Sequence, residues 1–166
     1  MDPRAVTTMK HLVYHQFGEP DVLTLEEAPV PEPGPEDVLV RVMAAGLNPI
    51  DWKTRRGLGF AARQIENRLP WTPGYDMAGE VVAVGEKVAT LVPGDRVMGM
   101  VGFPTSGGAC AQFLVAPSTE LAIVPEEQEL LPAAGIPLSG LTASQALFDV
   151  GELEPGQKVL VHAGAG

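Results

Sequence analysis

Residues 74–85 read Gly-Tyr-Asp-Met-Ala-Gly-Glu-Val-Val-Ala-Val-Gly, and no other stretch of the chain says as much about its fold. The glycines punctuate a turn, and the β-branched run from Glu80 to Val84 predicts a strand directly after it. Gly85 and the Pro-Gly-Asp of residues 93–95 mark further turns. The stretch therefore predicts short strands separated by tight turns.

Comparable short runs lie on both sides of this stretch. Residues 10–17 and 22–25 predict a strand and its return, and the apolar run 38–45 is the strongest candidate for a central strand. Residues 107–124 add two more short strands. Many short strands with Gly and Pro turns are typical of a small β-barrel, which we expect over residues 9–125.

Toward the C-terminus the pattern becomes helical. Residues 138–150 predict a helix, because Pro137 suits its first position and Gly151 suits its end. Residues 158–163 then predict a short, buried parallel strand. Residues 126–166 are therefore expected to form a separate segment, which the family resemblance given below identifies with the truncated start of a dinucleotide-binding domain.

Gly164 and Gly166 follow the predicted strand with the spacing of the first two glycines of a G-x-G-x-x-G fingerprint. Glycines at these positions let the backbone approach a dinucleotide pyrophosphate. The third glycine and the helix that binds the pyrophosphate would lie beyond residue 166. We therefore expect the 166 residues by themselves to be inactive.

Composition limits the classes of partner. The 166 residues carry 21 acids against 11 bases, a net charge of −10, which argues against nucleic acid as a partner. Cys110 is the single cysteine, so an internal disulfide and a multi-cysteine zinc site are excluded. Residues 1–8 are expected to form a tail without an apolar signal region, and no run is long enough to span a membrane. A cytoplasmic location is the expectation.

The stretch 74–85 resembles the G-H-E-x-x-G-x-V pattern of the medium-chain dehydrogenase/reductase superfamily, in which the His is a catalytic zinc ligand. Here Tyr75 stands at the His position and Asp76 at the Glu position, and Asn48 stands where the zinc branch has a cysteine ligand. The chain thus resembles the N-terminal part of the zinc-independent quinone oxidoreductase and enone reductase branch. The resemblance implies a mainly β, GroES-like small barrel with short helices, followed by the first helix and strand of an incomplete Rossmann-type α/β domain. It also implies no zinc.

The resemblance further suggests roles for individual side chains near a nicotinamide. Asn48 can donate to a substrate carbonyl or hold the cofactor amide, and Lys53 can donate to a ribose hydroxyl or a forming enolate; for both, the alternative is a capped polar loop. Tyr75 is a candidate proton donor, although a phenol with a pKa of about 10 needs a nearby cation for that role. Its alternative is to fill the volume of the missing histidine. Asp76 is expected to orient its neighbours, and Thr142 matches a family threonine near the nicotinamide ribose.

Together these features predict that the whole protein is an NADPH-dependent oxidoreductase acting on a small-molecule enone or quinone, with NAD not excluded. Hydride would pass to the substrate without a Lewis-acid metal, so hydrogen-bond donors must hold the enolate oxygen. A homo-oligomer is expected. Two alternatives stay open: a zinc-independent alcohol or ketone oxidoreductase, and a non-enzymatic GroES-like binding module.

Overall fold

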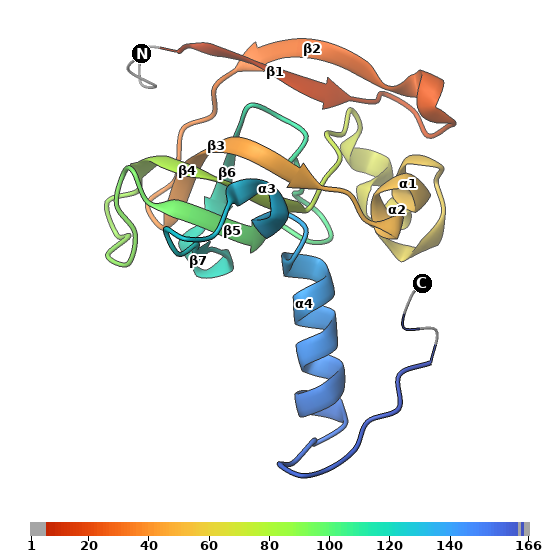
Figure 1. Cartoon of the computed structure of the whole chain (residues 1–166). Coiled ribbons are helices and arrows are strands. Elements are labelled where there is room, and N and C mark those ends of the chain that lie inside the picture. Colours follow the sequence, from red (N-terminus) through yellow and green to blue (C-terminus); the bar gives the residue numbers. More distant parts are fainter. Residues whose placement is uncertain (1–5, 163, 165–166) are drawn as a thin grey trace.

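The strands of the computed structural model, which describes residues 6–162 and 164, form two antiparallel sheets. A hairpin makes the first sheet, and the second has five strands in the order β6-β3-β4-β5-β7. The strands are β1 (Thr8–Val13), β2 (Thr24–Pro29), β3 (Asp37–Gly46), β4 (Asp76–Val84), β5 (Arg96–Met100), β6 (Phe113–Pro117) and β7 (Ala122–Ile123). In Figure 1 the hairpin lies along one side of the larger sheet, and Met9 and Val30 pack against Leu39 and Val82 there.

The centre of the larger sheet is β4, the strand predicted from the stretch 74–85. Its Met77 and Val81 are almost fully buried and pack against Val38 of β3 and Val97 of β5. The β-branched side chains suit this pleated, closely packed environment. β3 is irregular at two points of its pairing with β4, and such bulges bend a strand around a core.

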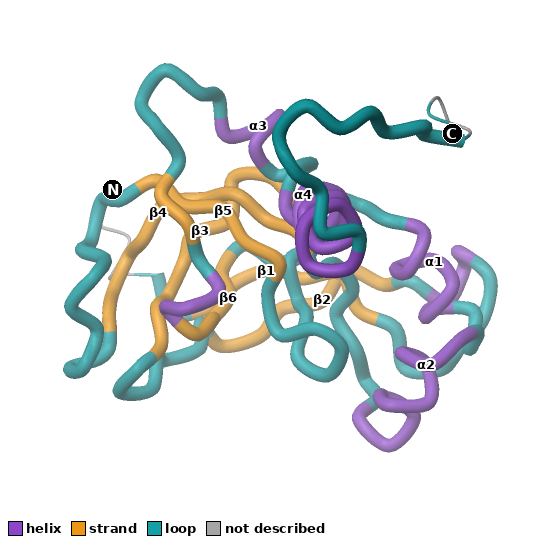
Figure 2. Tube along the Cα trace, turned by 90° about the horizontal axis from the view of Figure 1, so that it is seen from below, coloured by secondary structure: helices purple, strands orange, loops and turns teal. Residues whose placement is uncertain are grey.

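Helices connect β3 to β4 and also form within the C-terminal part, up to Val150. They are α1 (Pro49–Arg55), α2 (Gly59–Ile65), α3 (Leu130–Ala133), α4 (Pro137–Ser144) and its π-helical continuation η5 (Gln145–Val150), with short 3-10 turns η2 (Pro20–Val22), η3 (Glu66–Arg68) and η4 (Ser118–Glu120). α3 packs onto the sheet through Ala133, next to Ala78 of β4. α4 projects away from the strands in Figure 1 and is seen nearly end-on in Figure 2.

The β-rich fold class with short helices is confirmed, and so is the helix predicted over 138–150, with Gly151 directly after its end. The strand predicted over 158–163 is wrong over its described part, because residues 158–162 form no strand and Leu160 is 79% exposed; residue 163 lies outside the described residues. A parallel strand requires a neighbour that accepts and donates its ladder hydrogen bonds. No strand within the described part of the chain lies beside these residues. The division of the chain into residues 1–8, 9–125 and 126–166 remains a prediction.

Candidate active site

The loop that follows β3 turns directly into α1, and Asn48 is the residue that precedes the helix. Pro49 occupies the first helical position, where its missing N–H leaves no bond unmade. The Asp51 carboxylate accepts a hydrogen bond from the Asn48 backbone N–H at 2.8 Å and another from the Gly74 N–H at 3.1 Å. Asp51 therefore joins the start of α1 to the glycine that opens the stretch 74–85.

Asp76 lies at the centre of the polar contacts and is fully buried. Its Oδ2 accepts a hydrogen bond from Asn48 Nδ2 at 2.9 Å. The backbone N–H of Leu138, in the first turn of α4, is shared between Oδ1 at 3.0 Å and Oδ2 at 3.1 Å. Burial raises the pKa of Asp76, while the hydrogen bonds from Asn48 and Leu138 act in the opposite direction. One carboxyl group thus links the side chain of Asn48 to the beginning of α4.

Gly46 makes this link sterically possible. It is the last residue of β3 and pairs with Asp76 across the sheet. A Cβ at this position would overlap the backbone oxygen of Ala134 and would lie 2.9 Å from the Asp76 Cβ. Only glycine lets the segment between α3 and α4 approach so closely that Leu138 reaches the Asp76 carboxylate.

Tyr75 lies beside Asp76 in sequence, but its side chain is occupied elsewhere. The ring is 1% exposed, and its hydroxyl donates to the Pro104 carbonyl at 3.0 Å. Burial, followed by the negative charge of Asp51, raises the pKa of Tyr75 to about 12. No cation is among the groups that shift this pKa, so the geometry favours the volume-filling interpretation of Tyr75 over the proton donor.

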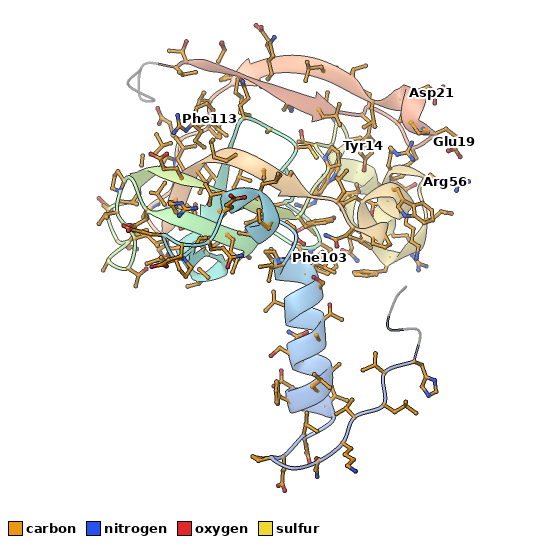
Figure 3. The ribbon with its side chains drawn as sticks, viewed as in Figure 1. Tyr14, Glu19, Asp21, Arg56, Phe103 and Phe113 are labelled. Atoms are coloured by element: carbon orange, nitrogen blue, oxygen red, sulfur yellow. The ribbon has the colours of Figure 1, made fainter. Side chains whose placement is uncertain are left out.

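The Tyr75 ring also belongs to an aromatic cluster. Phe103 contacts it edge-to-face with centroids 5.1 Å apart, and Phe60 of α2 contacts Phe103 in the same manner at 5.6 Å. Phe60 and Phe103 are partly exposed. Figure 3 shows Phe103 on the side of the sheet from which α4 projects, whereas Tyr14 lies on the opposite side, beneath the hairpin.

Lys53 is exposed on α1, and its Nζ lies 5.5 Å from the centroid of the Trp52 ring. Arg56 approaches the same ring, with its guanidinium carbon at 5.8 Å. Arg56 is also paired with Glu19 at 3.0 Å, and Figure 3 shows these two side chains close together at the end of α1. No salt bridge joins Lys53 to a carboxylate within the described residues, so its ammonium group is available to a ligand.

The remaining candidates lie on the C-terminal part. Thr142 is exposed on α4, and its hydroxyl donates to the carbonyl of Leu138, one turn earlier, at 2.7 Å. Gly164 is exposed in a turn, and Gly166 lies outside the described residues. The structure thus joins Asn48 to Asp76 and to the turn that precedes Thr142, but gives Tyr75 and Lys53 separate partners.

Sequence reasoning missed three parts of this arrangement. It treated residues 48–57 as a polar segment without predicting a helix, although Asn48, Pro49 and Asp51 follow the pattern of a helix start. It gave no role to the Leu138 N–H, because 62 residues separate it from Asp76 and no local pattern links them. It also passed over Phe103, for which no sequence signal was present.

The side chains that commonly bind metal ions are not grouped into a site in the described part of the chain. Residues 6–162 and 164 contain no group of three or more His, Cys, Asp or Glu side chains arranged to hold a metal ion. Burial raises the pKa of Cys110 to about 11, so the thiol stays protonated near neutral pH. The same residues include no helix that is long and apolar enough to cross a membrane.

Comparison with known proteins agrees with this fold. Residues 34–126 match the family described as the alcohol dehydrogenase GroES-like domain. The chain belongs to this family. Its relatives include proteins named as quinone oxidoreductases and as an alkenal/one oxidoreductase, which confirms the resemblance noted in the sequence.

Three similar proteins illustrate the relationship. The chloroplastic NADPH-dependent alkenal/one oxidoreductase of Arabidopsis thaliana is 39% identical to this chain. The match covers 95% of this chain and 42% of the Arabidopsis protein. The quinone oxidoreductase structure from Coxiella burnetii is 44% identical with a TM-score of 0.88, over 95% of this chain and 50% of that one. The Escherichia coli quinone oxidoreductase, solved with NADPH, is 30% identical with a TM-score of 0.77, over 89% and 43%. The chain spans about half the length of the relatives it matches.

Proposed function

We propose that the whole protein is an NADPH-dependent oxidoreductase that reduces α,β-unsaturated carbonyl compounds or quinones without zinc. One observation carries the proposal: the amide of Asn48 is held by the buried Asp76 at the place where the β-rich domain meets α4. The relatives named as alkenal/one oxidoreductase or quinone oxidoreductase match almost the entire chain and support the same chemistry.

The polar groups at this junction fit a nicotinamide nucleotide. Beyond its bond to Asp76, the Asn48 amide has a second N–H that can pair with a carboxamide or a ribose hydroxyl, while its oxygen belongs to the capping box with Asp51 at the start of α1. Lys53 is an exposed cation without a paired carboxylate within residues 6–162, which suits a ribose hydroxyl or a phosphate. Thr142 lies one turn further along α4 and can offer its hydroxyl to the same ligand. When bound, NADPH supplies the hydride; NADP versus NAD is not distinguished by these contacts.

The same residues can stabilise the negative charge that develops on the substrate oxygen. Donors held in advance at that position lower the barrier because they need no rearrangement during the reaction. Asn48 provides an oriented N–H and Lys53 a mobile ammonium group, and neither requires a metal. The amide of Asn48 and the phenol of Tyr75 are also unsuitable as zinc ligands, which take thiolate, imidazole or carboxylate.

Planar, apolar substrates are favoured by the neighbouring aromatic groups. Phe60 and Phe103 leave part of their rings exposed, and Tyr75 supports them from the interior. We assign Tyr75 to this wall, because its hydroxyl is engaged by Pro104 and its pKa is raised. Proton transfer to the enolate carbon would then come from solvent, since no stronger acid is placed there.

Turnover of enones and quinones by the whole protein with NADPH tests the proposal. Asn48→Ala and Lys53→Met should each reduce kcat by about 10²–10³-fold. Arg56→Met is the matched control, because it removes a second cation that contacts the same Trp52 ring. Wild-type turnover in both test variants, or no NADPH-dependent reduction of any enone or quinone by the wild type, would refute the proposal.

The location of the protein, its oligomeric state and two alternative functions remain predictions. A cytoplasmic location and a homo-oligomer fit an NADPH-dependent reductase of small molecules, although the Arabidopsis relative is chloroplastic. An alcohol or ketone oxidoreductase without zinc would use the same donors, and reduction of a saturated ketone in preference to an enone would favour it. A binding module would bind such ligands without turnover.

A further inference from the structure

We infer that Asp76 is a positioning residue that fixes which face of the Asn48 amide is presented to the ligand. The inference rests on the proposed function for its kinetic consequence, but its structural part stands by itself. An asparagine amide can turn over and exchange its oxygen and nitrogen with little change in shape. Its direction is therefore set by its hydrogen-bond partners.

The partner of Asn48 accepts hydrogen bonds only. Asp76 lies fully buried, and its Oδ2 is 2.9 Å from Asn48 Nδ2. The hydrogen bonds from Asn48 and the Leu138 backbone both go to this carboxyl group, as expected for an ionised acid, which carries no donor of its own. The reverse orientation of Asn48 would set its amide oxygen against a carboxylate oxygen in a buried place. The amide nitrogen must therefore face Asp76, and the amide oxygen faces the start of α1, where the Asn48 side chain forms a capping box with Asp51.

The Leu138 contact makes the arrangement rigid. A backbone N–H cannot exchange its role, and it is shared by both oxygens of Asp76 at 3.0 and 3.1 Å. It therefore fixes the plane of the carboxyl group that Asn48 meets. Because Leu138 belongs to the first turn of α4, the orientation of Asn48 is also tied to the position of this helix and of Thr142 on it.

An isosteric substitution exposes the role. In Asp76→Asn, one oxygen has to serve both donors: at the Oδ1 position it accepts from the Leu138 N–H and the new NH₂ group faces Asn48, and at the Oδ2 position it accepts from Asn48 and the NH₂ group faces Leu138. Two donors then oppose each other in either arrangement, and in the first Asn48 avoids this only by turning over and presenting its oxygen to residue 76. The substitution keeps the size of the side chain but removes one of the two acceptors that hold the Asn48 amide and the Leu138 N–H together.

The spectroscopic test uses the 166-residue protein labelled with ¹⁵N. The sequence contains two asparagines, Asn48 and the exposed Asn67, so labelling restricted to asparagine leaves two side-chain amide signals, and Asn67 serves as an internal reference. In the wild type, one Asn48 side-chain proton should be shifted downfield and protected from exchange relative to those of Asn67. This protection should be lost in Asp76→Asn. Equal shifts and exchange rates for both asparagines in the wild type would overturn the inference, even if the variant does not fold.

The kinetic test uses the whole protein with NADPH and an enone, and compares single and double variants. Asp76→Asn should lower kcat by about 10²-fold while KM for the enone changes by less than about threefold. In an Asn48→Ala background the same substitution should add less than about threefold to the loss, because it acts through Asn48. Asp95→Asn, which alters an acid that accepts the Val92 N–H in a distant turn, is the control and should keep wild-type kcat.

The outcomes separate the two claims. An equal loss from Asp76→Asn with and without Asn48 would show a merely structural role and overturn the inference while the reductase function stands. A wild type without enone or quinone turnover would refute the function, and the Asn48 amide signals would then decide the positioning of the amide alone.

Discussion

Replacing Gly46 by alanine should disrupt the site from a position that touches no ligand. The added methyl would overlap the carbonyl oxygen of Ala134 and press on the Asp76 Cβ. Both obstacles are firmly held, because Ala134 is buried in the contact with β4 and Asp76 lies in the strand itself. The segment leading into α4 would have to retreat by roughly 1 Å to restore normal contacts.

The cost can be estimated from two effects. Overpacking a closely packed position destabilises by about 1–3 kcal/mol. The retreat also stretches the Leu138–Asp76 hydrogen bonds, and losing a bond to a charged group costs about 1.5–3 kcal/mol. Alanine lowers the entropy of the unfolded chain, which offsets about 0.4–1 kcal/mol. The net expectation is a loss of about 2–4 kcal/mol in the free energy of unfolding.

Urea unfolding of the 166-residue protein measures this loss. Gly135→Ala is the matched control, since a methyl there lies 3.6 Å from its nearest neighbour, the Pro132 oxygen, in the same segment. Gly135→Ala should change the free energy of unfolding by no more than about 0.5 kcal/mol. If Gly46→Ala were as stable as Gly135→Ala, the close approach of the α3–α4 segment to β3 and β4 would be refuted.

Further measurements test other parts of the structure. Tyr75→Phe should keep kcat within severalfold and lower the free energy of unfolding by about 1 kcal/mol, because only the bond to Pro104 is lost; a collapse of kcat would restore Tyr75 as proton donor. Elemental analysis of the purified protein should find far less than one zinc per chain, and stoichiometric zinc after dialysis would contradict the assignment to the zinc-independent branch. The 166-residue protein should bind NADPH weakly in calorimetry and self-associate in light scattering, because residues 159–161 expose apolar side chains; micromolar binding by a monomer would contradict this. The free energy of unfolding of Asp76→Asn should increase relative to that of the wild type as pH rises above about 4, because ionisation of buried Asp76 destabilises only the wild type; a flat difference would contradict the raised pKa of Asp76.

The β-rich part of the fold was predictable because its signals are local. The run 38–45 and the stretch after Gly79 are apolar, β-branched and bounded by turn residues, and they form β3 and β4. The helix after Pro137 was predictable for the same reason. The strand predicted over 158–163 failed because its formation depends on a neighbouring strand, which no local pattern can supply.

The sequence named candidate residues for the site but not the contacts between them. Asn48, Lys53 and Tyr75 were selected by resemblance, but the sequence did not show which of them are joined. The contact between Asp76 and Leu138 spans 62 residues, and it depends on a glycine at position 46 whose importance is invisible without the neighbouring backbone. The different environments of Tyr75 and Lys53 likewise follow from the path of the chain around Pro104 and Trp52.

The buried acids beside Asn48 are held against their own preference for water. Burial is the leading cause that raises the pKa of both Asp51 and Asp76, and the charge of Asp76 raises that of Asp51 further. For an acid whose pKa is higher in the folded state, the stability contribution is fully present below the unfolded pKa of about 4 and is lost as pH rises through the folded value. Ionising these groups therefore lowers the stability of the fold near neutral pH. Each is retained where it orders something else: Asp51 the backbone at Asn48 and Gly74, and Asp76 the Asn48 amide and the start of α4. A loss of stability concentrated around one amide is the pattern expected where a protein orders a group for chemistry.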